Sequence, residues 1–219
     1  MTRVTDHTIE LGEVIVPDGV SGPWAIESFE ITKEQADHYN LWHMADKQAY
    51  HAVQPGRYKR LVLTEGEERH VVMSNTPMEV VTNLTAAAMA TGRVLINGLG
   101  LGMILHHILQ KPEVTEVIVV ERDDHVLRLV APTFQPNEKL VIVHADAFEY
   151  EPEGLFDFVW HDIWTFISDE NLEQMDRLEA KYSPIAKAQL CWARHDCEQM
   201  QQQMDEMLSF VKLLRGDPK

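Results

Sequence analysis

Three glycines in the segment GRVLINGLGLGMI, residues 92–104, are the first candidates for a chemical role. Gly98, Gly100 and Gly102 alternate directly after one apolar run and before another. Glycine has no Cβ atom, so alternating glycines at the end of a strand let a ligand approach the backbone closely. A dinucleotide, a nucleoside-containing ligand, or a tight strand-to-helix turn without a ligand would each suit such a loop.

The spacing of the glycines separates two kinds of nucleotide loop. A dinucleotide-binding fold needs G-x-G-x-x-G, in which the third glycine lets the helix pack closely on the strand. Counted from Gly98, the third glycine falls at position 103, which is Met103. The chain has G-x-G-x-G instead, which argues against a dinucleotide.

Acidic residues end the three apolar segments that follow the glycines. Glu121 closes VIVVE, Asp146 and Ala147 lie in HADAF, and Asp162 lies in FVWHDIW. Open α/β sheets bind ligands at the carboxyl ends of their strands, where these residues would converge. Glu121 is placed to accept hydrogen bonds from ribose hydroxyls and Asp146 from an adenine amine, while the Ala147 backbone donates to the adenine ring. The alternatives are a solvated acid for Glu121 and a turn-forming role for Asp146. Asp162 is open between a ligand contact, a general base and a cap of its turn.

With these elements in order, Gly92 to Trp164 resembles the core of class I S-adenosylmethionine-dependent methyltransferases, and in detail its spermidine synthase branch. VLINGLGLGM and HADAFEY are similar to the VLxIGGGDGG and GDAF-like elements of that branch. The resemblance implies a seven-stranded Rossmann-like fold, with S-adenosyl-L-methionine or its decarboxylated relative as cofactor. It also implies that the glycine loop meets the methionine part and the ribose, and that Asp162 faces the reacting centre.

Two positions depart from these relatives. Typical methyltransferases carry an acid two residues before the first glycine, which holds the methionine ammonium, and here that residue is Ile96. Spermidine synthases carry an aspartate between the second and third glycines, and here that residue is Leu101. A charge-assisted hydrogen bond contributes about 1.5–3 kcal/mol, so its loss weakens binding without abolishing it. Asp162 or Glu79 could take the place of the missing acids.

The residues therefore predict a cytoplasmic S-adenosylmethionine-dependent methyltransferase with a small-molecule or protein acceptor. Methyl transfer needs mainly positioning and one base at most, for which Asp162 is the first candidate and His161 the second. The missing acids favour an alternative, a non-catalytic S-adenosylmethionine-binding or interaction protein of the same fold. A second alternative is aminopropyl transfer, as in spermidine synthases, against which Leu101 argues.

The eleven histidines do not predict a metal site. His106 and His107 are adjacent in a helical segment and point different ways. His38 and His43 are five residues apart and miss the i, i+4 face of a helix. We expect no metal.

From residue 92 onward, apolar segments of strand length alternate with helical segments. Strands are expected at 93–98, 114–121, 139–146, 155–164 and 186–193, and helices at 102–110, 122–134, 168–182 and 197–214. This alternation predicts a parallel sheet with right-handed crossovers. The fold class is therefore α/β, with a Rossmann-like S-adenosylmethionine-binding domain over residues 76–219.

Residues 1–75 predict a small N-terminal cap of strand, helix and hairpin. A helix is expected over 31–53, with Thr32 and Gln35 as a capping box, and a hairpin over 58–74.

A further helix, over residues 75–92, leads from this cap into the sheet. Thr76 and Glu79 are spaced as a second capping box. The family's sheet is normally finished by a C-terminal hairpin, for which no sequence remains after residue 219. We expect a five-stranded core, completed by the N-terminal hairpin or by another subunit.

The net charge of the chain limits the classes of partner that it is expected to bind. Nineteen basic against 35 acidic residues give a formal charge of −16, which opposes a nucleic acid acceptor. No apolar run approaches the roughly 20 residues of a membrane-spanning helix, and the start lacks the pattern of a secretory signal. Cys191 and Cys197 lack C-x-x-C spacing, and reduced thiols in the cytoplasm are expected.

Methionines recur at helical spacing near the end of the chain. Met200, Met204 and Met207 lie in the helical segment 197–214. Their spacing predicts a core stripe or the contact face of a homodimer.

Overall fold

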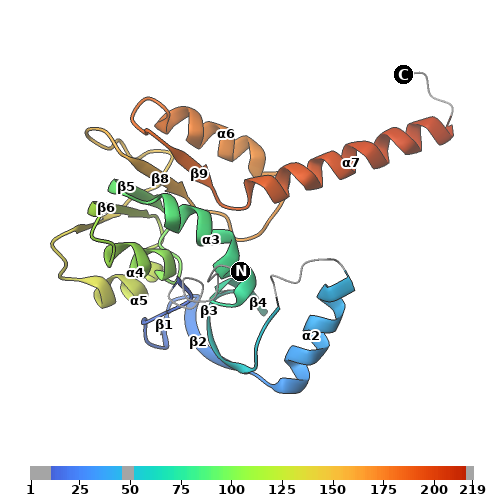
Figure 1. The fold of residues 1–219 in the computed structure, drawn as a ribbon, viewed down its shortest axis with the longest axis horizontal. Coiled ribbons are helices and arrows are strands. Elements are labelled where there is room, and N and C mark those ends of the chain that lie inside the picture. The colour runs from blue at the N-terminus through green and yellow to red at the C-terminus, as the bar shows by residue number, and fades with distance from the viewer. Residues whose placement is uncertain (1–10, 46–51, 216–219) are drawn as a thin grey trace, which may run out of the picture.

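The computed structural model describes residues 11–45 and 52–215. Two separate sheets and their helices make up this part of the chain (Figure 1). The N-terminal sheet is antiparallel, in the order β1-β2-β3-β4. Its strands are β1 (Gly19–Ser21), β2 (Trp24–Ile31), β3 (Gly56–Glu65) and β4 (Glu68–Ser74). The second sheet is parallel, in the order β7-β6-β5-β8-β9.

The parallel sheet consists of β5 (Gly92–Asn97), β6 (Val114–Glu121), β7 (Leu140–His144), β8 (Phe158–His161) and β9 (Gln189–Cys191). The helices are α2 (Lys33–Ala45), α3 (Pro77–Met89), α4 (Met103–Leu109), α5 (Asp124–Phe134), α6 (Asn171–Tyr182) and α7 (Arg194–Arg215). Val94, Leu95 and Ile96 on β5 are at most 1% exposed, because a parallel sheet is covered on both faces. The predicted α/β class and Rossmann-like core are confirmed.

The strand order creates the place for a ligand. The chain builds β5, β6 and β7 outward on one side, and then returns to add β8 and β9 on the other side of β5. In open α/β sheets, ligands bind at such a reversal of strand order, beyond the carboxyl ends of the strands. The carboxyl ends of β5 and β8 form this switch point here.

The expectation that the N-terminal hairpin completes the parallel sheet is wrong for the described residues. The hairpin β3–β4 turns at Gly66 as its sequence suggests, with φ at +64°. Its backbone groups are used by β2, which pairs with β3 from Trp24↔Leu63 to Ile31↔Gly56. The bounds of β2 were not predicted, and with it the hairpin forms a sheet of its own.

The helix caps were predicted with mixed success. Thr32 and Gln35 form the expected reciprocal box, with N···O distances of 2.9 and 3.2 Å. The helix they start is described as far as Ala45, and residues 46–51 lie outside the described part. Ala52 and Val53 are not helical, so the predicted end at residue 53 is wrong.

The box of Thr76 and Glu79 is wrong. The Thr76 side chain makes no cap hydrogen bond and instead lies 2.9 Å from the Ser74 hydroxyl. Glu79 is buried.

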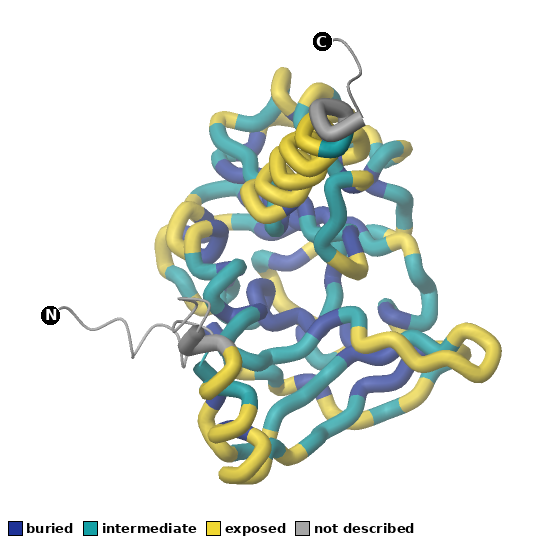
Figure 2. Tube along the Cα trace, turned by 90° about the vertical axis from the view of Figure 1, so that its right-hand side faces the viewer, coloured by how far each residue is buried: buried dark blue, intermediate teal, exposed yellow. Residues whose placement is uncertain are grey.

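Helix α7 extends away from both sheets, and most of its length is exposed (Figures 1 and 2). Its first turn packs inward through Cys197, which is fully buried. Met200, Met204 and Met207 are 44%, 46% and 55% exposed. The core alternative for this stripe is therefore wrong, and the homodimer alternative stays a prediction. In the described part of the chain, no helix combines the length and apolar character of a membrane span.

Candidate functional site

A cavity of about 160 Å³ lies at the switch point, between the carboxyl edge of the parallel sheet and the N-terminal sheet. The N-terminal sheet contributes an apolar wall of Trp24, Leu61, Leu63, Val72 and Met73. The parallel sheet and the segments beside it contribute the glycines Gly98 and Gly100 and five acids: Glu79, Glu121, Asp123, Asp146 and Asp162. Most of the residues predicted from the sequence therefore converge on one cavity.

A second cavity, of about 270 Å³, lies between α2 and the first turn of α3. Phe29, Tyr39 and Pro77 are among its lining residues. None of the predicted site residues lines it, so it is not the candidate site.

Gly98 and Gly100 line the cavity with backbone that no other residue adopts easily. Their φ angles are +100° and +50°. A Cβ atom on Gly98 would collide with the carbonyl oxygen of Asp162, and one on Gly100 would lie 2.6 Å from Met73 Sδ. The Leu101 N–H also points at this sulfur, 3.3 Å away. The need for these two glycines is therefore explained by the protein's own packing.

Gly102 serves helix packing and does not line the cavity. A Cβ atom there would lie 2.5 Å from Phe134 Cε2 on α5. Gly102 therefore allows the start of α4 to pack closely against α5.

Glu121 is held in place by two backbone groups. Its Oε2 accepts from the Leu99 N–H at 2.9 Å, and its Oε1 accepts from the Asp123 N–H at 2.8 Å. Burial raises the pKa of the Glu121 carboxyl. A carboxylate oxygen can accept more than one hydrogen bond, and Glu121 lines the cavity, so its oxygens are held in a fixed orientation as acceptors for a ligand.

Asp146 and Ala147 lie in the turn that follows β7. Asp146 Oδ1 accepts from the Phe148 N–H at 2.7 Å, which is the turn-forming role. Asp146 also lines the cavity, so the two interpretations are compatible. The Ala147 carbonyl accepts from the Tyr182 hydroxyl at 2.8 Å, which anchors the turn to α6.

Two acids face the other end of the cavity. Glu79 comes from the first turn of α3 and is 6% exposed, while Asp162 follows β8. Burial raises the pKa of Glu79 to about 8, with the nearby Asp162 charge adding to the effect. Burial likewise raises the pKa of Asp162 to about 7. Both carboxyl groups therefore keep their protons to higher pH than ordinary surface acids do.

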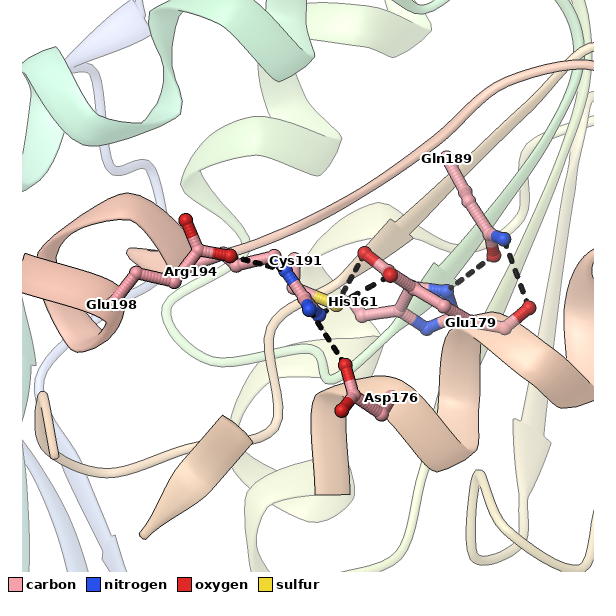
Figure 3. A network of polar contacts seen from close by, with 7 residues as sticks. All are labelled: His161, Asp176, Glu179, Gln189, Cys191, Arg194 and Glu198. Atoms are coloured by element: carbon pink, nitrogen blue, oxygen red, sulfur yellow. Dashed lines mark hydrogen bonds and ion pairs between the residues drawn. The ribbon is translucent and has the colours of Figure 1, made fainter. Parts of the chain in front are cut away.

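His161 is placed away from the cavity. Its ring is fully buried, and its Nδ1 lies 2.9 Å from Asn97 Nδ2. Its Nε2 lies 3.2 Å from Gln189 Oε1 (Figure 3). The ring centroid lies 5.2 Å from that of Tyr182. Burial lowers the pKa of His161 to about 4, so the ring is neutral at physiological pH. These contacts give it a structural setting beside β9.

Figure 3 also shows the polar network between α6 and the start of α7. Arg194 pairs with Asp176 at 2.6 Å, Glu198 at 3.0 Å and Glu179 at 3.2 Å. Gln189 Nε2 donates to the Glu179 carbonyl at 2.9 Å, which joins this network to His161. The network fastens α7 to the body of the protein.

Ile96 and Leu101, where relatives carry acids, are 1% and 0% exposed and do not line the cavity. An acid at either position would be buried in the core.

Trp24, Met73 and Asp123 are among the cavity residues that were not predicted from the sequence. Trp24 Nε1 donates to Asp123 Oδ2 at 2.7 Å, which joins the N-terminal sheet to the end of β6. Met73 reaches the glycine loop from β4. Asp123 also caps α5, and its position before a helix was the one available signal. Nothing local to Trp24 or Met73 indicates partners so distant in the sequence.

Within residues 11–45 and 52–215, no three His, Cys, Asp or Glu side chains are grouped to hold a metal ion.

No family model matches the sequence, and no curated protein matches it either. Among solved structures, the chain is similar to the N-methyltransferase NodS from Bradyrhizobium japonicum WM9. The two are 12% identical over 48% of this chain and 57% of that one, with a TM-score of 0.38. The chain is also similar to an S-adenosylmethionine-dependent methyltransferase from Clostridium acetobutylicum ATCC 824. These two are 14% identical over 49% of this chain and 44% of that one, with a TM-score of 0.36.

A third similar structure is a dimethyladenosine transferase from Plasmodium falciparum. It is 19% identical over 51% of this chain and 40% of its own, with a TM-score of 0.38. The matches span about half of this chain and about half the length of those proteins. The function of this chain is therefore argued from its own cavity.

Proposed function

We propose that the cavity binds S-adenosyl-L-methionine and that the protein transfers its methyl group to a small-molecule or protein acceptor. The observation that carries the proposal is the meeting of Glu121, the glycine loop and the Asp146–Ala147 turn at the switch point of a parallel sheet. This is the edge at which open α/β sheets bind nucleotide ligands.

The residues present fit such a cofactor. Glu121 offers two oriented acceptors to the ribose diol, and Asp146 offers an acceptor to the adenine amine. Trp24 and Trp164 line the cavity with aromatic surface suited to a flat base. Glu79 and Asp162 supply the negative charge that a cationic ligand needs, in place of acids at positions 96 and 101.

When bound, S-adenosylmethionine supplies an electrophilic methyl group. We assign Asp162 as the general base that removes the proton from the acceptor. A general base works best when its pKa is close to the working pH, and the pKa of Asp162 is about 7. His161 takes no part in this assignment, because it lies outside the cavity lining.

Calorimetric titration with S-adenosylmethionine tests the proposal. We expect one saturable site in the wild type and at least tenfold weaker binding in Glu121→Ala, because the ribose loses both acceptors. Glu113→Ala is the matched control, since Glu113 is a surface acid outside the cavity. Glu121→Ala also removes the acceptor of two backbone N–H groups, so a loss of affinity could come from a disturbed loop. Asp146→Ala is therefore a second variant, in which the affinity for S-adenosylmethionine should fall through the loss of the adenine contact.

The outcomes separate the alternatives. Unchanged affinity in a folded Glu121→Ala variant would refute the ribose assignment. Binding without transfer to any acceptor would favour the non-catalytic interpretation, and no binding by the wild type would overturn the proposal.

Aminopropyl transfer is the second candidate, and one feature of the cavity favours it. Among the described lining residues, the one cationic side chain is that of Arg122, which is exposed. The cavity therefore offers the carboxylate of S-adenosylmethionine no buried cation, and the decarboxylated relative lacks that group. Side-by-side titration of both forms decides: preference for the carboxylated form eliminates this candidate.

The net charge of the chain bears on the class of acceptor. A net charge of −16 opposes a polyanionic acceptor, so a small molecule or protein is proposed rather than nucleic acid. Radiolabelled methyl transfer to RNA, protein and small-molecule fractions would check this order of preference.

A further inference from the structure

Glu79 and Asp162 are acids in a setting that disfavours their charge. Only 6% of Glu79 is exposed, and both residues line the cavity. Neither forms an ion pair with any described residue. The Ser74 backbone N–H donates to Glu79, and a side-chain hydrogen bond with Trp160 lowers the pKa of Asp162. The wall opposite them includes the apolar side chains Leu61 and Leu63. A buried carboxylate without a cation is costly unless a ligand brings the charge.

The strand order sets the position of Asp162 relative to Glu121, while Glu79 comes from α3. β6, β5 and β8 are consecutive neighbours, and neighbouring strands lie about 4.8 Å apart. Glu121 at the end of β6 is thus separated from Asp162 beyond β8 by about two strand spacings, with the glycine loop of β5 between them. A nucleoside on Glu121 would extend its 5′ substituent across the glycine loop toward the pair.

We infer that Glu79 and Asp162 recognise the positive charge at the ligand's sulfur, so that the cavity binds the sulfonium cofactor more tightly than the thioether product. The inference rests on the proposed cofactor site. In the transfer, the acceptor's lone pair forms the new bond to carbon while the C–S bond breaks, and its electron pair stays on sulfur. The sulfur thereby loses its charge, and S-adenosylhomocysteine no longer neutralises the pair.

The pair therefore gives the reaction a direction at the binding step. Before transfer, the pair and the sulfonium stabilise each other in a cavity with an apolar wall, where such interactions are stronger than in water. After transfer the sulfur is neutral, and once Asp162 has passed on the acceptor's proton the pair again lacks a counter-charge, which favours release of the product. The other titratable groups of this cavity are Glu121, Arg122, Asp123 and Asp146, and the strand order sets them toward its opposite end.

Calorimetry with two ligands measures this preference. S-adenosylmethionine should bind the wild type roughly 10- to 100-fold more tightly than S-adenosylhomocysteine, as expected for one charge-assisted contact. An analogue with a protonated amine in place of the sulfonium should bind like S-adenosylmethionine, because its charge is the same.

Variants assign the preference to the pair. Glu79→Gln and Asp162→Asn should each reduce the ratio of the two affinities to within about threefold, mainly by weakening S-adenosylmethionine. Glu113→Gln makes the same chemical change outside the cavity and should leave the ratio unchanged. Thermal unfolding of each variant confirms that a changed ratio is measured on folded protein.

Two results would overturn the inference, and a third would instead mean that the proposed function fails. Equal binding of both ligands by the wild type overturns the inference while leaving the cofactor site intact. If both variants keep the wild-type ratio of the affinities for S-adenosylmethionine and S-adenosylhomocysteine, groups other than Glu79 and Asp162 recognise the sulfonium charge. If no adenosyl ligand binds at all, the proposed function itself fails.

Discussion

Two groups of acidic side chains lie near strand β8, and they are in opposite electrostatic states. Around Arg194, three acids share one guanidinium at distances of 2.6 to 3.2 Å (Figure 3). In the cavity, Glu79 and Asp162 lack any cation among the described residues, and both have raised pKa values. The paired acids fasten α7 to α6, whereas Glu79 and Asp162 form no ion pair among the described residues. Unpaired buried charge is therefore the better guide to a ligand site.

The largest expected effect comes from the backbone that positions Asp162. Gly98→Ala should destabilise the fold by about 3 kcal/mol or more, since its Cβ would collide with the Asp162 carbonyl at a left-handed φ. Gly66→Ala is the control, because Gly66 shares the positive φ but has nothing within 4 Å, and should cost about 1 kcal/mol. Urea unfolding of both variants measures the difference. Equal losses would show that the close approach at Gly98 is unimportant.

Next in size is the pH dependence of the cavity acids. Because the folded pKa of Glu79 is about 8, above its ordinary value of 4.5, its contribution to stability is fully present below about pH 4.5. It is lost as the pH rises through 8. Glu79→Gln should therefore be more stable than the wild type at pH 9, by on the order of 2–4 kcal/mol, and gain little at pH 5.

Thermal melts of Glu79→Gln and the wild type across this pH range give the readout. An identical pH profile for the two proteins would mean that Glu79 ionises as an ordinary surface acid.

A smaller loss is expected when the paired group loses its cation. Arg194→Met should destabilise the protein by about 1–2 kcal/mol, since three acids lose their partner at a partly exposed site. Arg128→Met removes an exposed i, i+4 pair with Asp124 and should cost less than about 0.5 kcal/mol. Chemical denaturation compares them. If Arg194→Met is as mild as Arg128→Met, the network does not hold α7.

The smallest effect is expected on the exposed face of α7. Met204→Glu should change the free energy of unfolding by less than about 0.5 kcal/mol, because Met204 is already 46% exposed. The homodimer prediction adds a second readout: light scattering should then give half the wild-type mass for the variant. A monomeric wild type would remove the homodimer alternative.

Local patterns predicted the parallel sheet well, for a physical reason. Each strand and its following helix are contiguous, so hydrophobic periodicity within about 20 residues reports both. The N-terminal sheet was harder, because β2 pairs with a strand beginning 25 residues after its own end. That pairing depends on contacts between distant segments, which no local pattern encodes.

The same distinction explains the site residues. The glycine loop and Glu121 were identifiable because strand ends are readable from the sequence. Glu79 matched a capping box locally, and its burial against the cavity is a tertiary effect. His161 was avoidable as a candidate: it ends a strand directly before Asp162, and consecutive side chains of a strand point to opposite faces.

A crystal structure of the protein soaked with S-adenosylmethionine tests the central claim most directly. The account predicts density in the cavity with the ribose hydroxyls on Glu121, the adenine beside Asp146 and Ala147, and the sulfonium between Glu79 and Asp162. An empty cavity at millimolar ligand, or a ligand bound elsewhere on the protein, would contradict it.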